Sequence, residues 1–160
     1  MKATAEILLQ AMRRYPTGVT IVSTRTAEGL PYGLTVNSFT SVSLDPLLVL
    51  VCLDNASSGI EHFLSADSFA VSLLAAGQQS VSIHFATSGT DRTDSGYVEG
   101  RLGLPLISGA LATLECSTHE RARAGDHTVL MGQVRHVHLD DNHPARSPLV
   151  YCGGNYFTLD

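Results

Sequence analysis

Residues 35–43, with the sequence TVNSFTSVS, form an uncharged polar segment in which hydroxyl and amide side chains alternate with apolar ones. Alternation with a period of two is typical of a β-strand that buries one face. Hydroxyls, the amide and free backbone N–H groups can together bind an anion such as a phosphate, and no carboxylate in the segment would repel it. A strand with one solvated face has the same composition, so both interpretations stay open at this point.

Three polar residues, Asn55, Ser57 and Ser58, precede a segment expected to be helical over residues 59–66. The N-terminus of a helix carries partial positive charge and unpaired N–H groups, so this position is a second candidate for phosphate binding. Ser58 and Glu61 also have the spacing of a capping box, and ordinary helix capping is the alternative interpretation of these residues.

His127 differs from the other histidines in its position, directly after an expected turn at residues 124–126 and next to Asp126. A turn can present a side chain to a pocket, although an ordinary surface histidine can occupy the same place. His136 and His138 would need a third ligand from elsewhere to bind a metal, and the sequence predicts no metal site. Glycine-rich nucleotide-binding motifs and the Gly-x-Ser-x-Gly motif are absent, which argues against a Rossmann-type nicotinamide site.

The composition is that of one globular domain of 160 residues, with 44% hydrophobic and 16% charged residues. The formal net charge is −5 and the basic residues are scattered, so no nucleic acid is expected as a partner. No apolar run is long enough to cross a membrane, so no membrane partner is expected either. Cys52, Cys116 and Cys152 lie far apart and lack metal-type spacing, which favours reduced thiols in a cytoplasmic protein.

The hydrophobic pattern predicts a chain dominated by strands, with a helix at the start and two more in the middle. The first helix is expected to be capped by Thr4 and to extend to about Tyr15. Strands are expected over residues 19–24, 33–44, 47–53 and 69–74, helices over 59–66 and 77–87, a surface loop over 87–103, a long hairpin from 109–120 and 128–139, and one or two short strands over 148–158.

The alternation over residues 33–44 places Leu34, Val36, Val42 and Leu44 on the core side of one strand. Strands and helices do not alternate along the chain as they do in a doubly wound sheet. A mostly antiparallel barrel with a few covering helices fits the order of elements better.

These segments, in this order, resemble the flavin reductase family whose members supply reduced flavin to two-component monooxygenases. The resemblance extends from about Met12 to Phe157. It rests on the motifs PTGVTIV ending at Val22, GLTVNSFTSVSLDP ending at Pro46, IEHFL from Ile60, FAVSLL from Phe69, the pair Phe85–Ala86, LEC ending at Cys116, GDH ending at His127 and GNY ending at Tyr156. Their order and spacing over the whole length make the match specific.

The resemblance implies a mainly β fold with a few helices, a split antiparallel β-barrel of the flavin reductase and FMN-binding type. It implies a single domain over residues 1–160 that forms a homodimer with the flavin near the subunit boundary. It places the flavin ring and ribityl chain along Thr35, Val36, Asn37 and Ser38, and the phosphate near Ser41, Val42 and Ser43. The phosphate or adenosine end would contact Asn55, Ser57 and Ser58, and Phe85 and Ala86 would form the wall beside the ring. His127 would face the nicotinamide, and Tyr156 would lie near the same pocket.

The activity that the resemblance implies is hydride transfer from NADH, or NADPH, to FAD or FMN. The reduced flavin would then diffuse to a partner monooxygenase. Two alternatives remain open: a non-catalytic flavin- or haem-binding split barrel, and an oxidase or oxygenase with its own organic substrate. The sequence departs from the family pattern after Arg92, where Thr93 replaces a common aromatic residue and Tyr97 takes the place of a common tryptophan.

Overall fold

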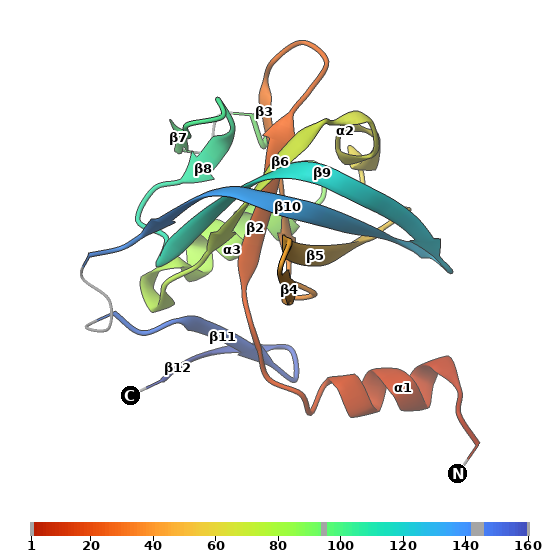
Figure 1. Ribbon diagram of the computed structural model, residues 1–160. Helices are drawn as coiled ribbons and strands as arrows, with labels where there is room; N and C mark the ends of the chain where they lie inside the picture. Colours follow the sequence, from red (N-terminus) through yellow and green to blue (C-terminus); the bar gives the residue numbers. More distant parts are fainter. Residues whose placement is uncertain (1, 94–95, 142–145, 160) are drawn as a thin grey trace.

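A seven-stranded antiparallel sheet forms the centre of the protein (Figure 1). The computed structural model describes residues 2–93, 96–141 and 146–159. The strands of the sheet are, in chain order, β2 (Thr20–Arg25), β3 (Pro31–Val36), β4 (Thr40–Leu44), β5 (Leu47–Asp54), β6 (Ser68–Leu73), β9 (Ala112–Ala124) and β10 (His127–Leu139). In space their order is β3-β2-β6-β9-β10-β5-β4.

The remaining elements are short and lie around this sheet (Figure 1). The helices are α1 (Ala5–Met12), α2 (Ile60–Ser65), the 3-10 helix η1 (Ala76–Gln78) and α3 (Gln79–Ala86). A small sheet has the order β1-β11-β12, formed by Thr17–Gly18, Leu149–Cys152 and Asn155–Thr158, and β7 (Tyr97–Glu99) pairs with β8 (Pro105–Ile107). Within the described ranges, no helix has the length and apolar character needed to cross a bilayer.

The two edge strands of the large sheet, β3 and β4, are consecutive in the chain, and no ladder within the described ranges joins them. β3 nevertheless contacts β5, the neighbour of β4, so the sheet bends back until its two ends meet. The result is an antiparallel barrel that is left open along one line, in agreement with the predicted split-barrel fold class. Because β3 pairs with a strand on one side only, the backbone N–H groups on its other side form no hydrogen bonds to another strand.

Two buried clusters hold the helices to the sheet. The larger cluster fills the barrel and includes Val22, Phe63 and Phe69, each at most 1% exposed. Phe63 is the buried residue of α2 and anchors that helix, and burial of one such side chain contributes about 1.5–3 kcal/mol. The second cluster includes Ile21 of β2 and Phe85 of α3, so α3 is packed directly against the strand beside β3.

The expected strand over residues 33–44 is two strands, because the chain turns at residues 37–39. The hydroxyl of Ser38 accepts from the backbone N of Cys52 and donates to its carbonyl O, each at 2.9 Å, which ties the turn to β5. β4 then pairs with β5 as an edge strand. The prediction that Val42 and Leu44 face the core is therefore wrong: they are 45% and 85% exposed.

The N-terminal helix begins as predicted, with Thr4 Oγ1 accepting from the backbone N of Ile7 at 3.3 Å. It ends at Met12 and not at Tyr15. None of its residues is buried, and Leu8 and Met12 are 61% and 53% exposed. In Figure 1 the helix lies apart from the large sheet.

The predicted capping box at Ser58 and Glu61 is wrong. Gly59 precedes α2 with a φ of +75°, and no side chain caps the helix. The segment expected to be a loop also contains β7, and the strand β8 was not predicted. The predicted helix over residues 77–87, the long hairpin of β9 and β10 and the short strands over 148–158 are confirmed.

Candidate functional site

A cleft of about 590 Å³ lies where the barrel is open. One wall consists of residues 34–38, at the end of β3 and in the turn that follows it. The opposite wall consists of residues 52–54 at the end of β5 and residues 56–58 of the next loop. The volume of the cleft falls in the range of small-molecule sites, about 300–1,000 Å³.

The β3 wall is made mainly of short polar side chains, and two of them form hydrogen bonds to α3 and β5. Thr35 Oγ1 donates to the carbonyl O of Ser82 in α3 at 2.7 Å, and Ser38 bonds to β5 as described above. Val36 and the exposed Asn37 complete this wall. The wall therefore presents mainly its backbone and the Asn37 amide to a ligand, because the two hydroxyls already have partners.

The structure brings most of the predicted site residues together in this cleft, namely Thr35, Val36, Asn37, Ser38, Ser57, Ser58, Phe85, Ala86 and His127. Ser41, Val42 and Ser43 do not line it. They lie on the edge strand β4, because the chain reverses direction before them. The phosphate contact predicted for these three residues has no support in this geometry.

Asn55 and Tyr156 also lie outside the lining of the cleft. Asn55 Oδ1 accepts from Thr128 Oγ1 at 2.6 Å and so joins the loop to β10, and its Nδ2 is buried with no acceptor in the described ranges. Tyr156 Oη is 2.8 Å from Ser82 Oγ, and its ring lines a separate cavity of about 180 Å³. That cavity shares part of the β3 wall with the cleft, so Tyr156 is a neighbour of the site and not part of its lining.

His127 is the first residue of β10 and lies opposite Asp54 in the ladder with β5, which places it in the cleft lining. Its Nδ1 is 2.7 Å from Asp126 Oδ1. This hydrogen bond lowers the pKa of Asp126, so the aspartate stays ionised as an acceptor. The contact orients the ring and leaves Nε2 for a ligand.

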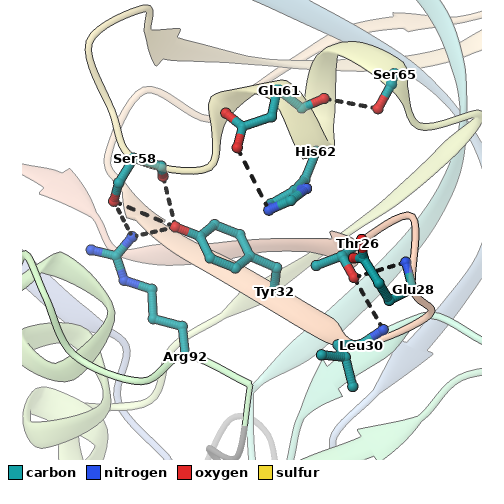
Figure 2. A network of polar contacts seen from close by, with 9 residues as sticks. All are labelled: Thr26, Glu28, Leu30, Tyr32, Ser58, Glu61, His62, Ser65 and Arg92. Carbon is teal, nitrogen blue, oxygen red and sulfur yellow. Dashed lines mark hydrogen bonds and ion pairs between the residues drawn. The ribbon is translucent and has the colours of Figure 1, made fainter.

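Arg92 is a residue of the cleft that the sequence reasoning missed (Figure 2). It is 5% exposed, although its segment was expected to be a surface loop. Nη1 donates to Tyr32 Oη at 2.9 Å and to Ser58 Oγ at 3.4 Å, and Nη2 donates to the carbonyl O of Thr87 at 2.9 Å. The signals in the sequence are an isolated basic residue shortly after the pair Phe85–Ala86 and its place in the family pattern noted above.

The charge of Arg92 is not neutralised within the described residues. Its Nε is buried with no acceptor there, and none of the ion pairs in that part of the chain includes its guanidinium. A buried charge without a counterion is unfavourable unless a ligand supplies the opposite charge. The cleft is therefore suited to a molecule with an anionic group.

The remaining lining suits a flat, partly apolar molecule. Val36 and Ala86 supply apolar surface, and the free side of β3 supplies uncharged donors. A planar ring with polar edges and an anionic tail matches this combination of groups. The residues present thus fit the flavin that the family resemblance implies.

Comparison with known proteins agrees with this geometry. The sequence model of a family described as "Flavin reductase like domain" matches residues 12–160. The chain is similar to the actinorhodin polyketide dimerase of Streptomyces coelicolor, with 39% identity over 160 residues, 99% of this chain and 89% of that protein. It is similar to the reductase component of the flavin-dependent trigonelline monooxygenase of Acinetobacter baylyi, with 39% identity over 152 residues, 94% of this chain and 48% of that protein.

Similarity extends to solved structures. The Streptomyces globisporus C-1027 NADH:FAD oxidoreductase, solved in complex with NAD and FAD fragments, superposes on the chain with a TM-score of 0.88. The two sequences are 38% identical, and the superposition covers 98% of this chain and 93% of that one. The two proteins thus share one fold over nearly all of this chain.

Proposed function

The chain belongs to the flavin reductase family, and on that premise we propose that it is an NADH:flavin oxidoreductase that reduces FAD or FMN. The observation that carries the proposal is the cleft, in which the free side of β3, His127 and the buried Arg92 line one space. NADH is the proposed donor because the similar structure with NAD and FAD fragments is that of an NADH:FAD oxidoreductase. NADPH is the alternative donor to be tested.

Residues 35–38 together with Phe85 and Ala86 would hold the flavin ring, and Ser57 and Ser58 would lie toward its tail. When both cofactors are bound, they supply the redox chemistry, in which a hydride passes from C4 of the nicotinamide to N5 of the flavin. The protein binds and orients the two molecules, which raises their effective concentration. Backbone N–H groups on the free side of β3 stabilise negative charge on the bound ring.

His127 would position the nicotinamide. Because Asp126 engages Nδ1, Nε2 of the neutral imidazole can accept a hydrogen bond from the carboxamide of the nicotinamide. This role affects binding and orientation of the donor, and it leaves the hydride transfer itself to the two cofactors.

The reduced flavin would leave the cleft and diffuse to a separate monooxygenase. One similar protein carries this arrangement in its name, as the reductase component of a flavin-dependent monooxygenase. A cytoplasmic location belongs to the same proposal, and Cys52, Cys116 and Cys152 are free thiols, as is typical of a reducing compartment.

A homodimer is a further part of the proposal. Large apolar side chains of α1 are more than half exposed, among them Leu8, Leu9 and Met12. A cavity of about 720 Å³ between the end of α1 and the turn at residues 37–40 shares Asn37 and Ser38 with the cleft. Exposed apolar patches like that on α1 mark interaction surfaces. A second copy of the chain that covered this patch would lie next to the β3 wall. Light scattering should give twice the chain mass of 17.0 kDa, and the mass of one chain would rule out the dimer.

Anaerobic stopped-flow absorbance tests the reductase activity. When the protein is mixed with an excess of FAD or FMN and then with NADH, the visible absorbance of the oxidised flavin should disappear over many turnovers. The same measurement with NADPH ranks the two donors. Binding of flavin without bleaching would favour the non-catalytic module. Flavin retained through purification, with consumption of an additional organic substrate, would favour an oxidase or oxygenase.

A further inference from the structure

The small cavity that Tyr156 lines adjoins the β3 wall of the cleft. Thr35, Asn37 and Ala86 line both spaces, whereas Ser82 and Tyr156 line only the cavity. The volume of the cavity, about 180 Å³, lies below the usual range of small-molecule sites, about 300–1,000 Å³. The groups that line it are therefore better suited to support the wall of the cleft than to bind a ligand of their own.

Ser82 of α3 connects two other elements through its two oxygen atoms. The residue is 0% exposed, and a buried hydroxyl needs a hydrogen-bond partner. Its Oγ is hydrogen-bonded to Tyr156 Oη of β12 at 2.8 Å, and its carbonyl O accepts from Thr35 Oγ1 of β3 at 2.7 Å. Ala86, which lines the cleft, follows Ser82 by four residues and so lies about one turn further along α3. The position of Ser82 therefore affects both the β3 wall and the α3 wall of the cleft.

The hairpin of β11 and β12 gives Tyr156 a fixed support. The backbone N of Leu149 in β11 donates to the carbonyl O of Leu74 at 3.0 Å, and Leu149 is 1% exposed. The ring of Tyr156 packs edge-on against that of Tyr151, its partner in the ladder, with centroids 5.3 Å apart. Because both the hairpin and the ring are held, the hydroxyl of Tyr156 has a defined position, and Ser82 is bonded to it.

We propose that Tyr156 is a positioning residue of the reductase, which acts through Ser82 to hold α3 against β3 and so sets the place of the flavin ring between them. The inference rests on the proposed function, because it concerns the walls of the same cleft. Without the Tyr156 hydroxyl, Ser82 Oγ loses its buried partner and α3 can shift relative to Thr35. Such a shift acts on the ring and not on the flavin tail, because Thr35 and Ala86 flank the proposed place of the ring. Tyr156 does not need to touch the flavin.

Single-turnover stopped-flow measurements test this role. Y156F removes one hydroxyl and S82A removes its partner, and neither residue belongs to the cleft lining. The rate of hydride transfer at saturating FMN and NADH should fall by about 3- to 10-fold in each variant, because loss of one buried hydrogen bond misplaces the ring. The NADH concentration that gives half the maximal rate should stay within about 2-fold of the wild-type value.

Two further variants complete the design. The double variant Y156F/S82A should be no slower than the slower single variant, because both substitutions break the same contact. Y151F is the matched control and should react at the wild-type rate. It removes a hydroxyl from the same hairpin and the same cavity, and it keeps the contact between Tyr156 and Ser82.

Flavin titration separates positioning from stability. The dissociation constants of FMN and FAD should rise by the same factor in Y156F, about 2- to 5-fold, because the two flavins share one ring and differ in their tails. A merely structural role would lower the melting temperature and leave the rates and dissociation constants of the folded protein unchanged. Wild-type rates in Y156F and S82A, unequal effects on the two flavins, or additive losses in the double variant would overturn this inference and leave the proposed function standing. Failure of the wild type to reduce either flavin would overturn both.

Discussion

Replacing Gly59 with alanine tests whether the arrangement of Tyr32 and Arg92 depends on one glycine. Gly59 has a φ of +75°, and a Cβ placed there would lie 2.5 Å from Oη of Tyr32. An alanine therefore meets two obstacles, the left-handed backbone and the ring of Tyr32. Since the ring must move, its hydroxyl loses the contacts with Ser58 and Arg92.

The magnitude follows from these two effects. The left-handed conformation costs an alanine about 1–2 kcal/mol. Each hydrogen bond that Tyr32 gives up removes about 1 kcal/mol more. We expect Gly59→Ala to lower the free energy of unfolding by about 3–4 kcal/mol.

Gly29→Ala is the matched control. Gly29 has a φ of +81°, and a Cβ there would have no atom within 4 Å. It should show the backbone cost alone, about 1–2 kcal/mol. The extra 2 kcal/mol or so at position 59 corresponds to a melting temperature lower by about 4–8 °C than that of the control.

Thermal unfolding followed by circular dichroism measures both variants, and FMN titration measures the site. Gly59→Ala should also weaken FMN binding, because Arg92 loses its contact with Tyr32, whereas Gly29→Ala should not. Equal melting temperatures and equal FMN affinities in the two variants would refute the reasoning. In a Tyr32→Ala background, Gly59→Ala should cost only the backbone term of about 1–2 kcal/mol, since the ring that obstructs the Cβ is then absent.

Two further predictions concern the other polar groups of the site. His127→Ala should raise the Michaelis constant for NADH by about 5- to 10-fold and leave FMN affinity unchanged, and unaltered steady-state kinetics would remove His127 from the site. Burial raises the pKa of Tyr97 above its ordinary value of 10.0, so above that pH the unfolded chain releases a proton that the folded chain keeps, and stability falls as pH rises. Relative to Y97F, the wild type should therefore lose up to about 1.4 kcal/mol per pH unit above pH 10 in urea unfolding, and parallel pH profiles would contradict this.

The sequence predicted the elements that depend on local patterns. The alternation over residues 109–120 and the turn around residues 124–126 predicted the hairpin of β9 and β10, because side chains alternate along a strand and Gly125 permits the φ of +65° found there. The helix over residues 77–87 was predicted in the same way. Across residues 33–44 the prediction of one continuous strand was wrong, because the chain turns between Val36 and Thr40.

The structure brings part of the predicted site together in the cleft and leaves Ser41, Val42 and Ser43 outside it. Thr35 to Ser38 reach the cleft and Ser41 to Ser43 do not, because the chain reverses between them. That reversal is held by two hydrogen bonds between Ser38 and Cys52, residues that lie 14 positions apart in the sequence. The period-two pattern is interrupted in the turn, where Ser38 and Thr40 fall on the apolar side and Phe39 on the polar side, but nothing in it identifies Cys52 as the partner.

The amino-acid sequence alone thus determined the mainly β fold class, the family and the short polar segments of the cleft, because strand periodicity, turn residues and motif order are written along the chain. The tertiary structure decided which of those segments meet and that Arg92 is buried among Tyr32, Ser58 and Thr87. Those partners come from three separate parts of the chain. The burial of a charge depends on what folds around it, and this is a property of the assembled barrel and not of the residues next to it.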